Sequence, residues 1–184
     1  QILLRGSHNL QNVLAACAIA AAAGLPVGAM QAGVAGFRGV AHRLEGVRTW
    51  RGVTWVNDSI ATAPERAMAA IRSFDEPLVL LAGGRDKNLP WDEFAALVCE
   101  RVAHLVVFGE LAGLIAERVR LAPGAARPVS VVECKNLQEA VRAAAEVASP
   151  GDVVLFSPGG TSFDEFRDFA ERGEVFKRWG FDLP

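Results

Sequence analysis

Three short polar segments of this sequence carry groups that can bind an anion or a nucleoside. Each follows a run of strand-forming residues, and the three are Asn57-Asp58-Ser59-Ile60-Ala61-Thr62, Gly83-Gly84-Arg85-Asp86-Lys87 and Ser157-Pro158-Gly159-Gly160-Thr161-Ser162. A lysine, hydroxyl groups at the start of a helix and backbone amides beside glycine together can hold a carboxylate or a phosphate. Asp58 has the wrong charge for that task and suits ribose hydroxyls better. The residues alone therefore predict an anion site beside a nucleoside, and they do not specify a reaction.

Each of these residues also has a purely structural interpretation. Asp58 can form a turn, Lys87 can be a solvated loop lysine, and Ser162 can cap the last helix with Glu165 completing a capping box. Taken one at a time, the structural interpretation is favoured. Neither the GxGxxG pattern nor the GxxxxGK[ST] phosphate loop occurs in the sequence, so function rests on the three segments acting together.

The elements that must position these segments alternate between strands and helices. The expected strands are 44–50, 53–57, 78–82, 105–108, 129–132 and 153–156, and the expected helices after the first two strands are 64–73, 91–102, 110–119, 137–148 and 163–172. Continuous runs of Val and Leu indicate strands buried on both faces, and each connection has the length of a helix. We therefore expect an α/β fold with a mostly parallel, Rossmann-like sheet and helices on both faces. Such sheets bind ligands at the carboxyl ends of their strands, where the three segments lie.

The first 40 residues differ from the rest in having no strand of their own. Ser7 can cap a helix over 8–23 that Gly24 closes, and Pro26 can open a second helix over 27–34. We expect residues 1–40 to be the helical end of another domain and residues 41–184 to be one α/β domain. Because the chain does not begin with methionine, we expect it to be a piece of a longer protein.

The composition limits the partners and the compartment. The 184 residues carry a net charge of −2, which gives no electrostatic case for nucleic acid or an anionic membrane. The longest apolar run, Val13 to Ala23, is too short to cross a bilayer. Three cysteines, far apart in the sequence, predict reduced structural thiols and no disulfide or metal site. These features predict a cytoplasmic protein that binds neither nucleic acid nor a membrane.

Several groups of residues, taken in order, resemble the Mur ligase family. They are Gly6-Ser7-His8-Asn9 with Asn12, Ala41-His42-Arg43-Leu44-Glu45, Asn57-Asp58-Ser59 with Ala61-Thr62, Gly83-Gly84 with Asp86-Lys87, Ser157-Pro158 with Ser162-Phe163-Asp164 and Phe166, and Arg172-Gly173 with Phe176. The resemblance extends over nearly the whole chain. The order of these groups and the Asn57-Asp58-Ser59 element with Ala61-Thr62 resemble the glutamate-adding branch of the family. It implies the end of the central ATP-binding domain over 1–40 and the complete C-terminal domain over 41–184.

The resemblance implies ATP-driven amide-bond formation in peptidoglycan synthesis, with D-glutamate added to UDP-N-acetylmuramoyl-L-alanine. ATP would phosphorylate the substrate carboxylate, the glutamate amine would attack the acyl phosphate, and Mg²⁺ would balance the phosphate charge. The partners implied are these small molecules, and the protein would be a monomer. The phosphate loop and most magnesium ligands would lie outside these 184 residues. We therefore expect no catalytic residue and no metal ligand in this chain, and no activity from it alone.

The resemblance also assigns roles to individual residues. It implies nucleotide binding by Asn9, Asn12, His42, Arg43 and Asp58, and glutamate binding by Thr62, Lys87, Ser162 and Phe163. In this arrangement His42 and Arg43 meet adenine and ribose at a hinge between domains, and Asp58 binds the ribose.

The sequence departs from the family pattern at two places in the segments expected to face the substrate. Ile60 stands where the family commonly has lysine, and Gly159-Gly160-Thr161 replaces the more usual Ala-Cys-Ala. They leave open which amino acid is added and its handedness. The alternatives are a sister amide ligase that uses another amino acid, including L-glutamate, and a folylpolyglutamate-type ligase. Those relatives carry a histidine-containing loop in place of residues 57–59. The non-enzymatic alternative is a stand-alone α/β ligand-binding module.

Overall fold

The computed structural model describes residues 4–123, 128 and 130–184, and only the backbone of Ser7 and His8. Its strands are β1 (Glu45–Trp50), β2 (Val53–Asn57), β3 (Leu78–Gly83), β4 (Val102–Phe108), β5 (Ser130–Cys134) and β6 (Val153–Gly159). Its helices are α1 (Ser7–Ala22), α2 (Val27–Gly36), α3 (Pro64–Ile71), α4 (Asp92–Arg101), α5 (Ala112–Leu121), α6 (Leu137–Val147) and α7 (Phe169–Phe181), and a 3₁₀ turn, η1 (Gly109–Leu111), precedes α5. The predicted start of the fifth strand, Val129, lies outside the described residues.

The six strands form one sheet in the order β1-β2-β6-β3-β4-β5. β1 runs antiparallel to β2, and the other four neighbouring pairs are parallel. The predicted fold class, a mostly parallel α/β sheet, is therefore confirmed. Since β2, β6 and β3 are neighbours and parallel, the three polar segments that follow them lie at one edge of the sheet.

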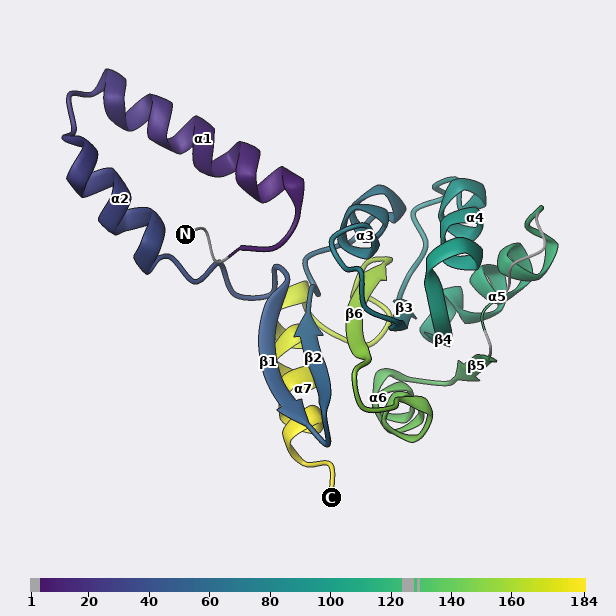
Figure 1. Cartoon of the computed structure of the whole chain (residues 1–184). Coiled ribbons are helices and arrows are strands. Elements are labelled where there is room, and N and C mark those ends of the chain that lie inside the picture. The colour runs from purple at the N-terminus through teal and green to yellow at the C-terminus, as the bar shows by residue number, and fades with distance from the viewer. Residues whose placement is uncertain (1–3, 124–127, 129) are drawn as a thin grey trace.

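Helices cover both faces of the sheet, as Figure 1 shows. The strand β3 illustrates why, because its side chains alternate between two fully buried cores. Leu78 and Leu80 belong to the core shared with α3, α4 and α5. Val79 and Leu81 belong to the core shared with α6 and α7. A strand of this kind has no solvent-facing side, which explains its continuous apolar sequence.

The first two strands form the predicted hairpin. Its turn residues, Arg51 and Gly52, both have left-handed backbones with φ of 51° and 80°. Two such residues in succession form the turn whose twist matches that of a two-stranded ribbon. The hairpin adds β1 as an antiparallel edge to the parallel sheet.

The last helix does not begin where we predicted. Residues 162–166 form a turn instead of the start of a helix, and α7 begins at Phe169. The cap is Asp168, whose side chain accepts a hydrogen bond of 2.8 Å from the backbone N–H of Glu171. Glu165 instead accepts a bond from the N–H of Leu137 at the start of α6. The predicted capping box of Ser162 and Glu165 is therefore wrong, and a second capping pattern, Asp168 with Glu171, begins the helix.

The first two helices form a hairpin that projects from the sheet domain (Figure 1). Both were predicted, although Gly6, not Ser7, occupies the N-cap position of α1. Several large apolar side chains of this hairpin are exposed: Leu10, Leu14, Ile19, Leu25, Val27 and Phe37. Among the described residues, none of the helices has both the length and the apolar character needed to cross a bilayer.

Candidate functional site

Backbone hydrogen bonds join the three polar segments to one another. The N–H of Gly159, at the end of β6, donates to the carbonyl of Ala61 at 2.8 Å. Arg85 and Thr161 exchange two bonds, of 2.9 and 3.0 Å, in an isolated antiparallel bridge. The structure therefore confirms that the segments after β2, β3 and β6 meet at one edge of the sheet.

Arg172, on α7, holds two of these segments together. Its side chain is fully buried, and its Nε and Nη2 donate to the hydroxyl and carbonyl oxygens of Ser59 at 3.1 and 2.9 Å. Its Nη1 donates to the carbonyl of Gly160 at 3.1 Å. Burial lowers the pKa of Arg172 to about 10, so the guanidinium stays charged at neutral pH. Sequence reasoning noted Arg172 in a motif but gave it no role, because its partners lie far away in the chain.

Two of the residues predicted to bind glutamate, Thr62 and Lys87, lie just after backbone positions that are hydrogen-bonded to another segment. Thr62 comes directly after Ala61 and is half-buried, and Lys87 is exposed two residues after Arg85. The described part of the chain offers the side chains of Thr62 and Lys87 no hydrogen bond or ion pair, so both can meet a ligand.

Ser162 and Phe163 lie on the third segment. Ser162 is buried, and its carbonyl accepts bonds from the N–H groups of Glu165 and Phe166 at 3.2 and 2.8 Å. Phe163 has 61% of its surface exposed. Because α7 begins seven residues after Ser162, that serine does not lie at the N-terminus of the helix and gains no attraction for an anion from the helix dipole.

Asp58 is buried, and both of its carboxyl oxygens have partners in the chain. Oδ1 accepts from the N–H of Leu44 at 3.1 Å, and Oδ2 accepts from the hydroxyl of Ser157 at 2.7 Å. Burial raises the pKa of Asp58 to about 6, although these two bonds and the charges of Arg43 and Arg66 act to lower it. Asp58 lies in the wall of a cavity of about 370 Å³, which we call the Asp58 cavity; it is also lined by Arg43, Leu44, Ile60, Ala61, Glu65, Arg66, Ala69 and Ala70.

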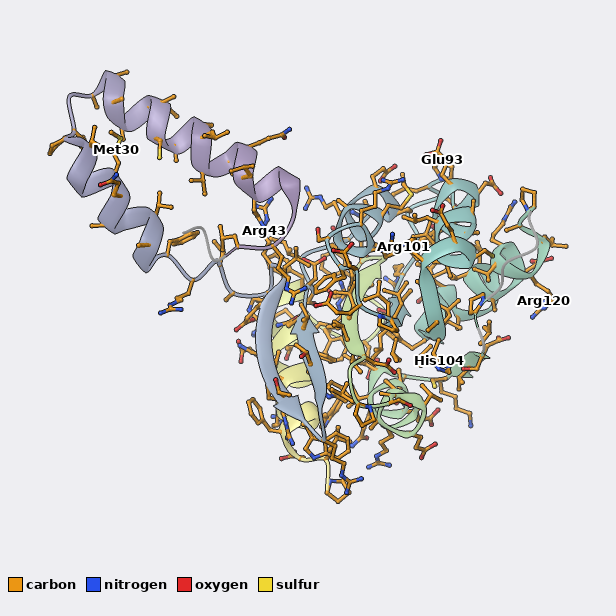
Figure 2. The ribbon with its side chains drawn as sticks, viewed as in Figure 1. Met30, Arg43, Glu93, Arg101, His104 and Arg120 are labelled. Carbon is orange, nitrogen blue, oxygen red and sulfur yellow. The ribbon has the colours of Figure 1, made fainter. Side chains whose placement is uncertain are left out.

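A second cavity, of about 680 Å³, lies between α1 and α2 and reaches the start of the sheet domain. Asn9, Asn12 and Arg43 contribute to its lining. The side-chain amide of Asn9 donates to the carbonyl of Arg5 at 2.7 Å. Figure 2 shows Arg43 where the helical hairpin joins the sheet domain. Arg43 lines both cavities, so four of the five predicted nucleotide residues fall along two adjoining hollows.

His42, the fifth, lies elsewhere. It is buried with a left-handed backbone, and it is not one of the residues that line either cavity. Its Nδ1 lies 3.0 Å from the amide nitrogen of Asn57, and its Nε2 lies 3.6 Å from Oε1 of Glu174 on α7. Glu45 accepts bonds from the N–H of His42 at 2.9 Å and from Asn57 at 3.0 Å. In this structure His42 therefore connects the turn before β1 to α7.

Metal ligation is not supplied by these residues. In the described ranges, no group of three or more His, Cys, Asp or Glu side chains is arranged to hold a metal ion.

A third cavity, of about 730 Å³ and lined in part by Trp50, Arg51 and Trp179, lies by the β1–β2 turn, away from the three segments.

Comparison with known proteins adds to this geometry. Residues 42–160 match the family described as Mur ligase, glutamate ligase domain. The UDP-N-acetylmuramoylalanine–D-glutamate ligase of Symbiobacterium thermophilum is 48% identical over 177 residues, which cover 96% of this chain and 38% of that protein. The enzyme of the same name from Pelotomaculum thermopropionicum is 46% identical over 174 residues, which cover 95% of this chain and 37% of that protein. The chain thus spans little more than a third of the length of these relatives.

Solved structures share the fold at low sequence identity. The UDP-N-acetylmuramate–alanine ligase of Thermotoga maritima has a TM-score of 0.71 at 17% identity, covering 98% of this chain and 38% of that one. The folylpolyglutamate synthase of Mycobacterium tuberculosis, solved with ADP and AMPPCP, has a TM-score of 0.67 at 22% identity, and the match covers 97% of this chain and 41% of that one.

The family match, over residues 42–160, extends over most of the sheet domain and includes the segments after β2 and β3. This chain belongs to the Mur ligase family and contains its glutamate ligase domain.

Proposed function

We propose that the protein containing this chain is an ATP-dependent ligase that joins D-glutamate to UDP-N-acetylmuramoyl-L-alanine. The observation that carries the proposal is the set of three hydrogen-bonded segments at the carboxyl edge of a Mur ligase glutamate domain. The names of the relatives that are 42 to 48% identical favour D-glutamate as the amino acid. Because this chain matches only part of those proteins, the activity belongs to the whole protein.

In the proposed arrangement, residues 1–40 are the end of the ATP-binding domain and residues 41–184 are the glutamate domain. The exposed apolar side chains of α1 and α2 support the first assignment, since a surface of this kind is usually covered by another part of a protein. The two continuous cores of the sheet domain support the second.

The reaction brings together three groups: the substrate carboxylate, the terminal phosphoryl group of ATP and the amine of glutamate. The carboxylate of the UDP-linked substrate takes the terminal phosphoryl group of ATP and releases ADP. The glutamate amine then attacks the acyl carbon, and phosphate leaves as the amide forms. An ionised glutamate is held most effectively by a positive charge and by hydroxyl donors. We assign these roles to Lys87, Thr62 and Ser162, with Phe163 beside them.

We propose that the nucleotide lies along the two adjoining hollows. Asn9 and Asn12 line the first, Arg43 lines both, and Asp58 lines the second. Asp58 would accept hydrogen bonds from ribose hydroxyls, which requires the nucleotide to share or displace its present bonds from Leu44 and Ser157. His42 would act by fixing the turn that carries Arg43.

We assign Mg²⁺ to no residue of this chain, because the described residues do not form a group of metal ligands. The ion would balance the charge on the phosphates when ATP binds.

The test is an assay of the full-length protein with ATP and UDP-N-acetylmuramoyl-L-alanine. D-glutamate, L-glutamate and D-aspartate are supplied separately, and both phosphate release and the amide product are measured. We expect turnover with D-glutamate. A preference for L-glutamate would leave the ligase reaction standing and refute D-glutamate as the amino acid. Turnover only in a parallel assay, in which a folate acceptor replaces UDP-N-acetylmuramoyl-L-alanine, would identify the folylpolyglutamate-type ligase. No turnover with any amino acid would refute the proposed function.

A further inference from the structure

The Asp58 cavity is lined by two arginines, Arg43 and Arg66, of which sequence analysis assigned only Arg43 to a ligand. Besides Asp58 and Arg43, its lining includes Glu65 and Arg66 from the first turn of α3. Sequence reasoning gave Arg66 no role, since an arginine on an exposed helical turn is an ordinary surface residue. Its position at the cavity calls for a different interpretation.

The guanidinium of Arg66 lies beside the segment that follows β2. Its Nη1 donates to the carbonyl of Ile60, with a long distance of 3.5 Å between the two atoms. Ile60 itself lines the cavity and brings no charge. Within the described chain Arg66 has no ion-pair partner, and its side chain is exposed. Its charge is therefore available at the cavity to a ligand from solvent.

The fold itself gains little from Arg66. A positive charge in the first turn of a helix is opposed by the helix dipole, whereas the neighbouring Glu65 is favoured there. The buried side chains of Pro64, Ala67 and Met68 already hold α3 against the sheet. A role in stability therefore does not account for the position of Arg66.

We propose that Arg66 is an oxyanion-binding residue of this site, acting with Arg43 at the Asp58 cavity. A guanidinium can donate two parallel hydrogen bonds to a phosphate or a carboxylate, and two arginines on different elements can hold one such group from two sides. Arg43 comes from the turn before β1, and Arg66 comes from α3. The proposal rests on the proposed function for the identity of the anion, which is either a phosphate of ATP or a carboxylate of the amino acid.

The test compares Arg66 with Arg72, the C-cap residue of α3, in the full-length protein. Arg66→Ala removes the proposed contact, and Arg72→Ala removes an exposed arginine at the end of α3 that does not line the cavity. We expect Arg66→Ala to raise the KM for one substrate about tenfold, as the loss of one charge-assisted contact in a solvated site does. A rise in the KM for ATP identifies a phosphate, and a rise in the KM for glutamate identifies a carboxylate. Arg72→Ala should leave both constants unchanged.

A second variant separates lost charge from altered structure. Ile60→Lys in the Arg66→Ala background places an ammonium group at the same cavity from the neighbouring segment. We expect it to restore most of the lost affinity, and we expect Arg66→Ala to unfold at the temperature of the unmodified protein. The proposal is refuted if Arg66→Ala and Arg72→Ala behave alike. It is also refuted if Arg66→Ala raises both constants and Ile60→Lys reverses neither.

Failure of this proposal can be distinguished from failure of the proposed function. If the unmodified protein shows no ligase activity, the proposed function fails, and binding of ATP and of glutamate can still be measured by calorimetry. Weaker binding of either by Arg66→Ala, relative to Arg72→Ala, supports the oxyanion site. Unchanged binding of both overturns it.

Discussion

Lys87 and Asp58 belong to the same edge of the sheet, but their charged groups have very different surroundings. The side chain of Lys87 is exposed and makes no bond within the described chain, whereas Asp58 is 5% exposed and accepts two hydrogen bonds. Removing the lysine should therefore affect ligand binding alone. Changing the aspartate should affect folding as well.

For Lys87, we predict that Lys87→Ala raises the KM for glutamate at least about tenfold, because one charge-assisted hydrogen bond to a carboxylate is lost. The KM for ATP should stay within about twofold, since the contact is not shared with the nucleotide. Steady-state kinetics of the full-length protein measures both constants. Lys135→Ala, which removes another exposed lysine just before α6, is the matched control. An equal effect on both constants would contradict the assignment of Lys87 to the amino acid.

For Asp58, the raised pKa predicts how stability changes with pH. The carboxyl group ionises near pH 3.8 in the unfolded chain and near pH 6 in the folded one. Between these values the folded chain binds more protons, so the free energy of unfolding falls as pH rises from about 4 to about 6 and is level above that range. The size of this change is about 2 kcal/mol between about pH 4.5 and about pH 7.

Urea unfolding at these two pH values measures the effect. Asp58→Asn cannot ionise, so the variant should lack this contribution while it keeps those of the other titrating groups. The difference between the two proteins isolates Asp58. If the unmodified protein and the variant change equally with pH, burial does not control the ionisation of this carboxyl group.

The sequence correctly predicts where the three polar segments lie, because chain topology decides their position. Residues 57–62, 83–87 and 157–162 follow strands that were correctly expected to be parallel, and parallel strands present their carboxyl ends on one edge. Arg172 and Arg66 could not be found in this way. Arg172 contacts Ser59 across 113 residues, and no local pattern reports so distant a partner.

At the scale of elements, α7 shows where local signals conflict. Two capping patterns occur within ten residues, Ser162 with Glu165 and Asp168 with Glu171. The second starts the helix, because Glu165 is bonded to the start of α6. Strand ends were also misjudged. β4 begins at Val102 and β6 continues to Gly159, beyond the apolar runs, because pairing with a neighbouring strand extends them.

The position of α7 depends on Arg172. Replacing it by methionine keeps the length of the side chain but leaves the carbonyls of Ser59 and Gly160 without their buried donors. We predict that Arg172→Met lowers the free energy of unfolding by about 3 kcal/mol, as is usual when one member of a buried polar network is removed. Chemical denaturation measures this change.

The control for this prediction is Arg178→Met on the exposed face of the same helix, which should change stability by less than about 0.5 kcal/mol. Hydrogen exchange should also become faster at Ser59 and at the start of α7 in Arg172→Met. Equal stability of the two variants would show that α7 is held by its apolar face alone.

At the scale of the whole molecule, the helical hairpin and the sheet domain differ in how they are stabilised. Every buried member of the two hydrophobic cores lies between Val53 and Phe176. The hairpin is tied to the sheet domain by Arg5, which forms an ion pair of 2.8 Å with Glu76 and lies over the ring of Phe74. Exposed ion pairs contribute little to stability. The two parts therefore share a chain without sharing a core.

We predict that residues 41–184 fold without residues 1–40. Removing the hairpin takes away no buried core residue, and the lost contacts of Arg5 are worth about 1 kcal/mol. For a chain of this size that lowers the Tm by about 2–4 °C. The shortened chain should also associate less with itself, because the exposed side chains of Leu14, Ile19 and Val27 are gone. Thermal unfolding followed by circular dichroism measures the first effect, and light scattering after gel filtration measures the second. A fall in Tm of more than about 10 °C would mean that the hairpin is part of the folding unit, and the boundary near residue 40 would then be wrong.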